Sequence, residues 1–527
     1  MDPVIAIFVI LAVAIVAFVS GKVAIEIVAL GVALALWATG VLTLPEALAG
    51  FGDPTVLFIA SLFVVSESLD ATGVTVWIAQ HVVGRAGTKR GRLTVVIGAI
   101  AAVLTAFISI NGAVAALLPV VVVVALRARI VPSRMLIPLA FAASAGSLLT
   151  LTGTPVNILV SQAAAQAGGR EFGFFEFAIV GVPLVLCTVA LVALLGRRLL
   201  PAREADHVDG VTDTGEKARL LRESYAVDLD TRTLFSAQDG VVEVLIAPRS
   251  SLIGRRVSPG MTTTEEDLVI LAIRRGDEVP DASAGRTRSF TLQAGDAVLV
   301  QGPWGALERY SRSRDVIAVT SPQTLQRAVP LGRGAKRALV VLGVMVVLLA
   351  TGLLPPAVVG LLAAGSLIAM RVLSVRQTYR SISWTTIVLI AGMIPLSGAF
   401  VSTGAADVVA GAVLSFTGGA SPLLALLVLC VVTLLLGQFI SNVATVLIVM
   451  PIAVSVAQTA GVSIQPFMMA LTVAGAAAFL TPIATPVNLM VMRPGGYRFG
   501  DYWKLGLPLA LVFLAFAVLY VPLIWPF

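Results

Sequence analysis

The chain has 527 residues, of which 58% are hydrophobic and 12% are charged. A soluble domain carries about 25% charged residues, so this composition excludes a soluble protein and predicts a multi-pass protein in a lipid bilayer. The formal net charge is +7. Because the basic residues lie mainly in short loops between apolar segments, where they set membrane topology, we expect no nucleic-acid partner. The apolar segments hold no nucleophile or acid/base constellation, so we do not expect an enzyme.

Three apolar segments open the chain and predict membrane spans over residues 4–20, 23–42 and about 55–78. Each is close to the ~20 residues that a helix needs to cross a bilayer. No basic region precedes the first segment, so we expect an uncleaved span rather than a signal peptide. The third segment carries Glu67 near its middle. An acid at that depth is a candidate proton relay, with a helix contact or a cavity-facing position as the alternative.

Residues 92–127 are apolar between their basic ends except for the cluster Ser109-Ile110-Asn111-Gly112 near the centre. The segment is too long for one span and too short for two spans with a loop. Basic residues flank both ends, so both ends are expected on the cytoplasmic side. We therefore predict a re-entrant hairpin with a polar tip, in which Asn111-Gly112 forms the turn.

The next segment, residues 135–166, predicts a broken helix, because Gly153 and Pro155 interrupt it. A further span at about 178–196 ends at Arg197-Arg198, which places its end in the cytoplasm. These elements complete a first membrane half over residues 1–200.

Residues 201–337 are charged and polar, and we expect them in the cytoplasm. Alternating apolar residues predict strands at 242–247, 268–273 and 297–300, and a helix is expected over about 304–312. The pattern predicts a small α+β domain over residues 240–319, between linkers at 201–239 and 320–337.

The membrane pattern of the first half repeats over residues 338–527. A shift of 331 positions, to within one residue, matches Ser66 with Ser397, Thr72-Gly73 with Thr403-Gly404, Ser109 with Ser441 and Thr154-Pro155-Val156-Asn157 with Thr485-Pro486-Val487-Asn488. This repeat predicts a second hairpin at 421–458 and a second broken helix at 466–492. Each half then holds five spans, and an odd number inverts the second half and places both termini outside.

The two hairpin tips and the two broken helices offer hydroxyls, amides and helix ends, with no Lys or Arg among them. Helix N-termini carry partial positive charge and favour anions. Ser, Thr, Asn and carbonyl oxygens suit a hard cation such as sodium. The sequence thus predicts an anion site with coupling cations near the membrane midplane, and no other cofactor.

At these residues the chain resembles the divalent anion/sodium symporter family of the ion transporter superfamily, which carries Ser-Asn-Thr motifs at its hairpin tips. The resemblance covers both membrane halves, about 390 residues, and implies a dimeric elevator transporter that couples sodium to dicarboxylate, citrate or sulfate. By position, the implied sodium ligands are Thr105, Ser109, the main chain at Ile110 and Gly153 in one site, and Ile440, Asn442, Ala484 and Pro486 in the other. The implied substrate contacts are Asn111, Thr154, Ser441, Asn442 and Thr485.

The tips depart from the family pattern, because Ile110 displaces the asparagine of the first tip by one position and Val443 replaces the threonine of the second. These changes favour a small inorganic oxyanion such as sulfate, or a different coupling stoichiometry. The alternative function is a cation/proton or oxyanion exchanger of the same superfamily that uses Glu67. A ligand-gated channel is disfavoured, because the chain has no filter-like sequence.

The polar insert resembles the RCK C-terminal (TrkA C-terminal) regulatory domain at Ser251-Leu252-Ile253-Gly254-Arg255 and over residues 292–302. Such domains pair into dimers, and some bind small regulatory ligands, including cyclic dinucleotides. The resemblance implies a regulatory role for the insert and supports a homodimer. We expect the protein in the inner (plasma) membrane of a bacterium.

Overall fold

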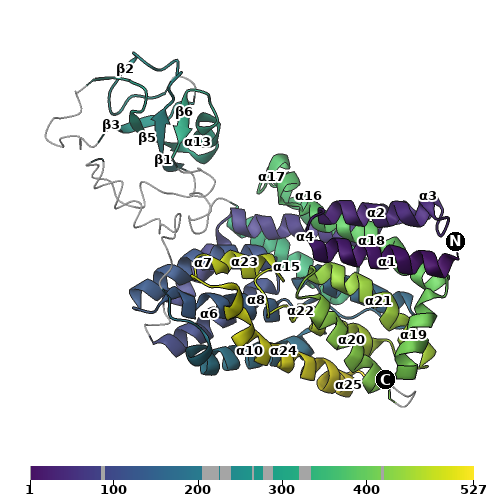
Figure 1. Ribbon diagram of the computed structural model, residues 1–527. Coiled ribbons are helices and arrows are strands. Elements are labelled where there is room, and N and C mark those ends of the chain that lie inside the picture. The colour runs from purple at the N-terminus through teal and green to yellow at the C-terminus, as the bar shows by residue number, and fades with distance from the viewer. Residues whose placement is uncertain are drawn as a thin grey trace. The chain divides into compact units, whose positions relative to one another are not determined.

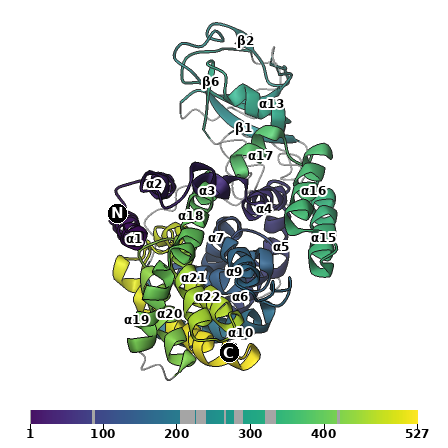
Figure 2. The same cartoon turned by 90° about the vertical axis from the view of Figure 1, so that its right-hand side faces the viewer.

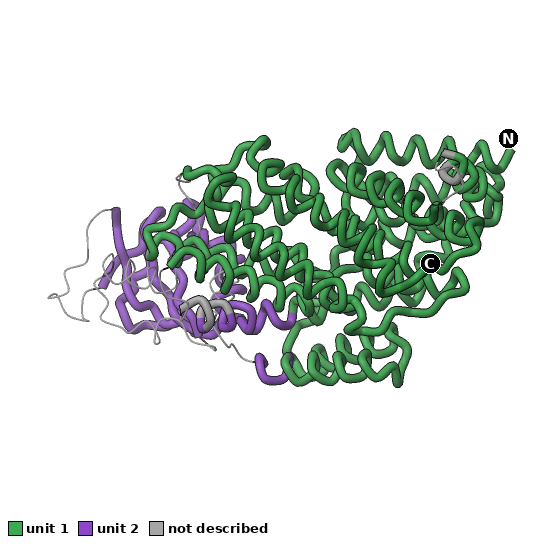
Figure 3. Tube along the Cα trace, turned by 90° about the horizontal axis from the view of Figure 1, so that it is seen from below, with its two compact units in different colours: residues 1–67, 82–208, 339–527 green, residues 68–81, 209–338 purple. Residues whose placement is uncertain are grey.

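The structure, a computed structural model, describes residues 2–84, 89–203, 225, 239–263, 266–276, 289–319, 334–416 and 421–527 (Figure 1). The chain divides into two compact units. One comprises Met1–Glu67, Val82–Val208 and Leu339–Phe527 and is called the helical unit here, and the other comprises Ser68–His81 and Asp209–Ala338 (Figure 3). The predicted linkers at 201–239 and 320–337 fall mostly outside the described residues.

The first half of the chain forms a series of helices separated by short connections. In chain order they are α1 (Pro3–Ser20), α2 (Ile25–Ala38), α3 (Leu44–Leu48), α4 (Pro54–Ala71), α5 (Val74–Gly84), α6 (Arg90–Thr105), α7 (Ile110–Arg127), α8 (Leu136–Gly146), α9 (Pro155–Gln166) and α10 (Ala178–Leu199).

The second half forms a matching series in the same order. It comprises α15 (Ala335–Thr351), α16 (Pro356–Ala369), α17 (Val375–Ser381), α18 (Trp384–Ser402), α19 (Ala405–Phe416), α20 (Pro422–Leu436), α21 (Asn442–Thr459), α22 (Gln465–Ala476), α23 (Pro486–Met492), α24 (Tyr502–Ala515) and α25 (Val521–Ile524). Both ends of α2 and α16 differ by 331 positions, and both ends of α7 and α21 differ by 332. The helices of the two halves therefore follow one another at a nearly constant offset.

Six helical segments in the described part of the chain are long and apolar enough to cross a membrane. They are Pro3–Ser20, Leu44–Ala71, Ala178–Leu199, Trp384–Ser402, Asn442–Thr459 and Phe499–Ile524. Many of their large apolar side chains remain exposed, as Val16 and Leu194 do at 68% and 75%. Lipid accounts for such exposure, since lipid-facing side chains need no cover from water.

The prediction of a single third span over residues 55–78 is wrong at its C-terminal end. Helix α4 ends at Ala71, and α5 begins at Val74. Gly73 lies between them with a φ of +68°, a left-handed conformation that ends helices and that glycine adopts without strain. Gly404 has a φ of +77° at the matching break between α18 and α19.

The second unit contains two small antiparallel sheets and one helix, α13 (Trp304–Ser311). The four-stranded sheet comprises β1 (Asp239–Ile246), β3 (Val269–Arg274), β5 (Ala297–Pro303) and β6 (Val316–Ala318), and the two-stranded sheet comprises β2 (Arg256–Val257) and β4 (Phe290–Thr291). The order β3-β5-β1-β6 places β5 against both β1 and β3, with Val242 paired to Val300. The strands predicted at 242–247, 268–273 and 297–300 overlap β1, β3 and β5.

An ion pair between the exposed Arg275 side chain and the buried Asp296 carboxylate fastens the turn before β5. Arg275 donates from Nε to Asp296 Oδ1 at 2.8 Å, and the Gln293 amide donates to Oδ2 at 2.8 Å. Burial disfavours the charged form of Asp296, but these hydrogen bonds outweigh burial and hold the pKa of this carboxyl below its usual range.

Candidate functional site

Both predicted hairpins have a serine at the point where the second arm begins. Ser109 caps α7, and its Oγ accepts from the Gly112 amide at 3.2 Å. Ser441 caps α21, and its Oγ accepts from the Ala444 amide at 3.4 Å. The first amides of a helix have no partner within the helix, so a serine cap at this position starts a helix inside an apolar segment.

The predicted turn at Asn111-Gly112 is wrong, because both residues lie in the first turn of α7. The chain reverses between Thr105, where α6 ends, and Ser109. The capping preference of Ser109 decides the outcome, since it fixes the helix start one residue later and draws Asn111 and Gly112 into the helix.

The first tip is bound to the break of its own half. Thr150 and Thr152 both donate their hydroxyls to the Ala106 carbonyl, the second over 3.4 Å. The Ser109 amide donates to Ser66 Oγ on α4 at 3.0 Å. The structure thus brings the tip, which carries predicted ligands Ser109 and Ile110, next to the segment that leads to Gly153.

The second tip is bound to its break in the same way, with one additional side chain. Thr481 donates its hydroxyl to the Gln438 carbonyl at 2.9 Å. The Gln438 side chain, 3% exposed, donates to the Ala477 carbonyl at 3.1 Å and accepts from the Leu480 amide at 2.9 Å. These bonds hold the tip that carries Ile440 and Asn442 against the segment that leads to Ala484 and Pro486.

The five predicted substrate contacts share a structural position. Each lies at the start of a helix: Asn111 in α7, Thr154 before α9, Ser441 and Asn442 at α21, and Thr485 before α23. Among them, Thr485 Oγ1 accepts from the Asn488 amide at 3.2 Å, whereas Thr154 makes no side-chain cap.

The two halves interleave around these helix starts. Helix α23 of the second half packs against α7 and α8, and Figure 1 shows it beside α7. Helix α9 of the first half packs against α21 and α22, as seen in Figure 2. Each half therefore completes the surroundings of the other's polar elements.

The lining of these elements is polar but uncharged. Residues 93–126, 135–169 and 408–492 contain no Asp, Glu, Lys or Arg. Within the described chain, Oδ1 of Asn442 and Oγ1 of Thr445 are buried without a hydrogen-bond partner. The described residues hold no cluster of three or more His, Cys, Asp or Glu that suits a transition metal. Unpaired neutral oxygens are instead the ligands that hard cations accept.

Two predicted residues differ from the rest in their surroundings. Thr105 is fully buried at the end of α6, and its hydroxyl donates to the Ala101 carbonyl of its own helix at 2.9 Å. Glu67 directly follows Ser66 on α4, and adjacent helix residues do not share a face. The structure brings Ser66 to the first tip, where its Oγ accepts from the Ser109 amide.

Sequence reasoning missed several side chains that build the breaks. They are Ser66, Thr150, Asn157, Gln438, Thr481 and Asn488. The repeat carried a signal for five of them, because Ser66 matches Ser397, Thr150 matches Thr481 and Asn157 matches Asn488 at the offset of 331. No repeat signal marks Gln438, since Ala106 occupies the corresponding place in the first half.

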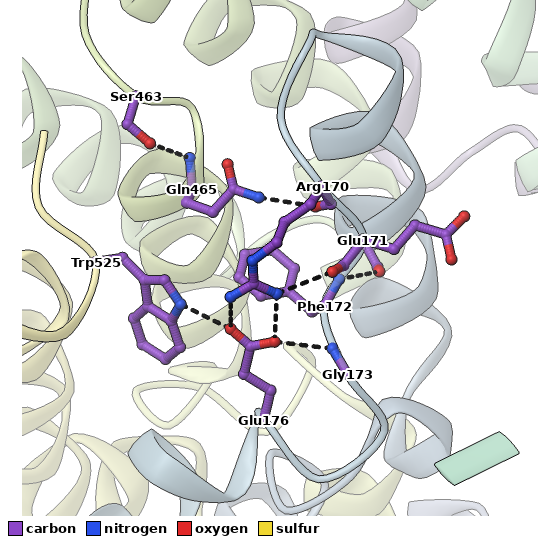
Figure 4. A network of polar contacts seen from close by, with 9 residues as sticks. Arg170, Glu171, Phe172, Gly173, Glu176, Ser463, Gln465 and Trp525 are labelled. Carbon is purple, nitrogen blue, oxygen red and sulfur yellow. Dashed lines mark hydrogen bonds and ion pairs between the residues drawn. The ribbon is translucent and has the colours of Figure 1, made fainter. Parts of the chain in front are cut away.

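A polar network joins the loop after α9 to the second half (Figure 4). Arg170 donates to both oxygens of Glu176, at 2.7 and 2.5 Å, and Trp525 donates its indole N–H to the same carboxylate at 2.8 Å. Gln465, in the first turn of α22, donates to the Arg170 carbonyl at 2.7 Å. This network ties the loop of one half to the broken helix and the last helix of the other.

Acid is expected to weaken the network at Glu176. Burial disfavours the charged carboxylate, but hydrogen bonds from Arg170, the Gly173 amide and Trp525 outweigh burial and lower its pKa from the usual 4.5. Because the folded-state pKa is lowered, the stabilisation is present above about pH 4.5 and is lost as pH falls through the lowered value. Glu176→Gln should therefore show a smaller loss of thermal stability than the unmodified protein between pH 7 and pH 3.

The measurement is the thermal unfolding midpoint of detergent-purified protein across that pH range. Glu171→Gln is the matched control, because Glu171 is exposed and its carboxylate points away from the network in Figure 4. If the unfolding midpoints of Glu176→Gln and the unmodified protein fall equally between pH 7 and pH 3, the stabilising role of the ionised Glu176 carboxylate is contradicted.

Comparison with known proteins gives the following similarities. The chain matches the family model described as citrate transporter, CitMHS, over residues 15–474 and 403–527. The uncharacterized transporter YfbS of Escherichia coli (strain K12) is 31% identical over 98% of this chain and 98% of its own length. Sodium/sulfate cotransporter 1 of Chlamydomonas reinhardtii is 25% identical over 56% of this chain and 30% of its own length. Among solved structures, the Alcanivorax borkumensis YdaH transporter aligns with 90% of this chain and 86% of its own at 15% identity and a TM-score of 0.47.

Proposed function

Because this chain belongs to the citrate transporter family (CitMHS), we propose that it is a secondary active transporter of a small divalent anion, sulfate or a dicarboxylate, coupled to sodium ions. The observation that carries this proposal is the uncharged lining of the two tips and the two breaks. Helix starts supply partial positive charge for an anion without a fixed Lys or Arg, and unpaired oxygens such as Asn442 Oδ1 supply cation ligands. Cations bound beside the anion then offset its charge in a low-dielectric site.

Sulfate is the substrate that we favour. Ile110 and Val443 leave each tip short of one polar side chain that a longer dicarboxylate with two separated charges needs. A compact tetrahedral oxyanion is satisfied by amides and hydroxyls from fewer directions. Two relatives named sodium/sulfate cotransporters agree with this choice. The match to this chain spans 30% and 31% of their length.

The proposed mechanism is an elevator movement of the interleaved helices. The nearly constant offset between the earlier helices of the two halves, 331 for α2 and α16 and 332 for α7 and α21, supports two repeats, which we propose are inverted, so that the hairpins enter the bilayer from opposite faces. In this arrangement both termini lie outside and residues 201–337 lie in the cytoplasm of a bacterial inner membrane. We further propose that the protein is a homodimer, and that the sheet-containing insert regulates transport by binding a small ligand such as a cyclic dinucleotide.

The test is uptake of sulfate, succinate and citrate into proteoliposomes, with an inward sodium gradient or an equal potassium gradient. We expect sodium to accelerate sulfate uptake at least ~10-fold. Uptake of none of the three anions under sodium, or equal uptake under potassium, would end the proposal. Uptake of citrate or succinate in preference to sulfate would correct the substrate and leave the coupling standing.

The exchanger that uses Glu67 makes a different prediction. Glu67→Gln keeps the side-chain size and removes the titratable group, so an acid relay would lose its function. Because the proposed sodium symport needs no acid relay, we expect Glu67→Gln to retain uptake within ~3-fold. Loss of uptake together with loss of its pH dependence would favour the exchanger.

A further inference from the structure

One asparagine holds each of the two helix breaks together. In the first half, Asn157 Nδ2 donates to the carbonyls of Ser147 at 3.0 Å and Thr150 at 2.7 Å. In the second half, Asn488 Nδ2 donates to the carbonyls of Ala478 at 2.9 Å and Thr481 at 3.0 Å. The sequence separations are the same in both halves, ten and seven residues. The two breaks therefore use a common device.

The bonds solve a specific problem of an interrupted helix. The segments between α8 and α9 and between α22 and α23 interrupt the helix, so their carbonyls lack the usual helical partners, and an unpaired carbonyl inside a membrane protein costs several kcal/mol. Each asparagine lies in the first turn of the next helix and returns both amide hydrogens to these carbonyls. Asn157 and Asn488 are 0% and 1% exposed, so no water replaces the bonds from the surface.

A second, independent contact restrains each break from the other side. Gly181 of α10 lies so close to the Leu148 carbonyl that an added Cβ would be within 3.0 Å of it, and Gly506 of α24 approaches the Phe479 carbonyl equally closely. In each break, two consecutive carbonyls are therefore held in place. The first accepts a hydrogen bond from the asparagine, and the second packs closely against the glycine. The carbonyls that remain further along the break are the ones near Gly153 and Ala484.

The side-chain oxygens of the two asparagines make no hydrogen bond in the described chain. In the described chain, Oδ1 of Asn157 and Oδ1 of Asn488 are buried and have no hydrogen-bond partner. A side chain whose nitrogen is used twice and whose oxygen is unused cannot be replaced by aspartate, because an ionised carboxylate repels both carbonyls. The two positions therefore require a side chain with an NH2 group, because both hydrogen bonds of each asparagine are donated.

We propose that Asn157 and Asn488 are positioning residues for the two cation sites, holding the backbone of each break so that the carbonyls near Gly153 and Ala484 face the bound cation. The proposal rests on the sodium coupling put forward above. It predicts that each asparagine affects sodium affinity far more than anion affinity, because the break carbonyls that it positions are proposed ligands of the cation and not of the anion.

The experiment compares Asn157→Asp, Asn488→Asp and the unmodified protein in proteoliposomes. We expect the sodium concentration for half-maximal uptake to rise at least ~10-fold in each variant, which corresponds to about 1.4 kcal/mol. The KM for the anion at saturating sodium is expected to change less than ~3-fold. Gln458→Glu makes the same amide-to-acid change at an exposed position of α21 and should leave both values unchanged.

A binding readout keeps the test independent of transport. Sodium, compared with potassium, should raise the thermal unfolding midpoint of the unmodified protein in detergent, and the aspartate variants should need ~10-fold more sodium for the same rise. If an aspartate variant does not fold, Asn→Gln at the same position keeps both donors on a longer side chain and is expected to shift sodium affinity ~3-fold or more.

The outcomes separate the two proposals. Sodium-independent uptake by the unmodified protein ends the proposed coupling, whatever the variants do. Sodium-dependent uptake with unchanged sodium half-saturation in the aspartate variants overturns the positioning role alone. Equal increases in sodium half-saturation and anion KM also overturn it, because they indicate a general loss of structure.

Discussion

Gly506→Ala is expected to abolish anion uptake and to destabilise the protein by roughly 3 kcal/mol or more. The added methyl group would lie within 3.0 Å of the Phe479 carbonyl oxygen and close to its carbonyl carbon, and neither atom belongs to a flexible side chain. Overpacking a rigid interior typically costs 1–3 kcal/mol, and here the atoms that must move also carry the second break. Gly181→Ala should have a similar effect through the Leu148 carbonyl.

The measurement is the thermal unfolding midpoint in detergent together with proteoliposome uptake. Gly343→Ala in α15 and Gly365→Ala in α16 are matched controls, because an added Cβ meets nothing within 4 Å at either position. Alanine is the better helix former, so these controls should be neutral or gain up to ~1 kcal/mol. Normal uptake by Gly506→Ala would show that α24 does not hold the break.

Asn442→Leu is the second change with a large expected effect, a loss of sodium-driven uptake of at least ~100-fold. Asn442 is the first residue of α21, and its buried Oδ1 has no partner in the described chain. Leucine keeps the approximate volume but removes the amide, whose Oδ1 we propose binds sodium and whose Nδ2 we propose donates to the anion. Because a buried polar oxygen is removed rather than created, the fold should be retained.

The corresponding change in the first half provides the control. Ile110 is the first residue of α7, as Asn442 is of α21, and it lacks a ligating side chain. Ile110→Asn should keep uptake within ~3-fold and lower the sodium concentration for half-maximal uptake. Retention of more than a tenth of uptake by Asn442→Leu, measured at saturating sodium, would contradict the proposed role of the second tip.

The general plan of the membrane segments was predictable because it is local. A Ser and Asn cluster inside an apolar run, or a Thr-Pro pair inside a helix, reveals itself within about ten residues, and the repeat at an offset of 331 supplied a second copy of each signal. The sheet of the insert was predictable for the same reason, since its strands alternate in polarity. The helix end at Gly73 was within reach too, because Gly404 repeats it, but glycine inside an apolar run does not distinguish a break from close packing.

The contacts across the two halves were not predictable from the sequence. Helical periodicity identifies a buried face without naming its partner, so it does not show that α23 packs on α7 or that α9 packs on α21 and α22. Gln438 illustrates the limit within one half. A single glutamine in an apolar segment predicts only that a partner exists, and three of its partners, the Ala477 carbonyl, the Leu480 amide and the Thr481 hydroxyl, lie about 40 residues away at the second break.

The network at Glu176 becomes complete only when the end of the chain has been synthesised. Trp525, which donates to Glu176, lies 349 residues further along the chain. At 5–20 residues per second, the ribosome needs about 17–70 s to supply that partner. During this interval Glu176 has its partners Arg170 and the Gly173 amide from the same loop but lacks Trp525. The Glu176 carboxylate therefore gains its last hydrogen-bond partner only when synthesis of the chain is almost finished.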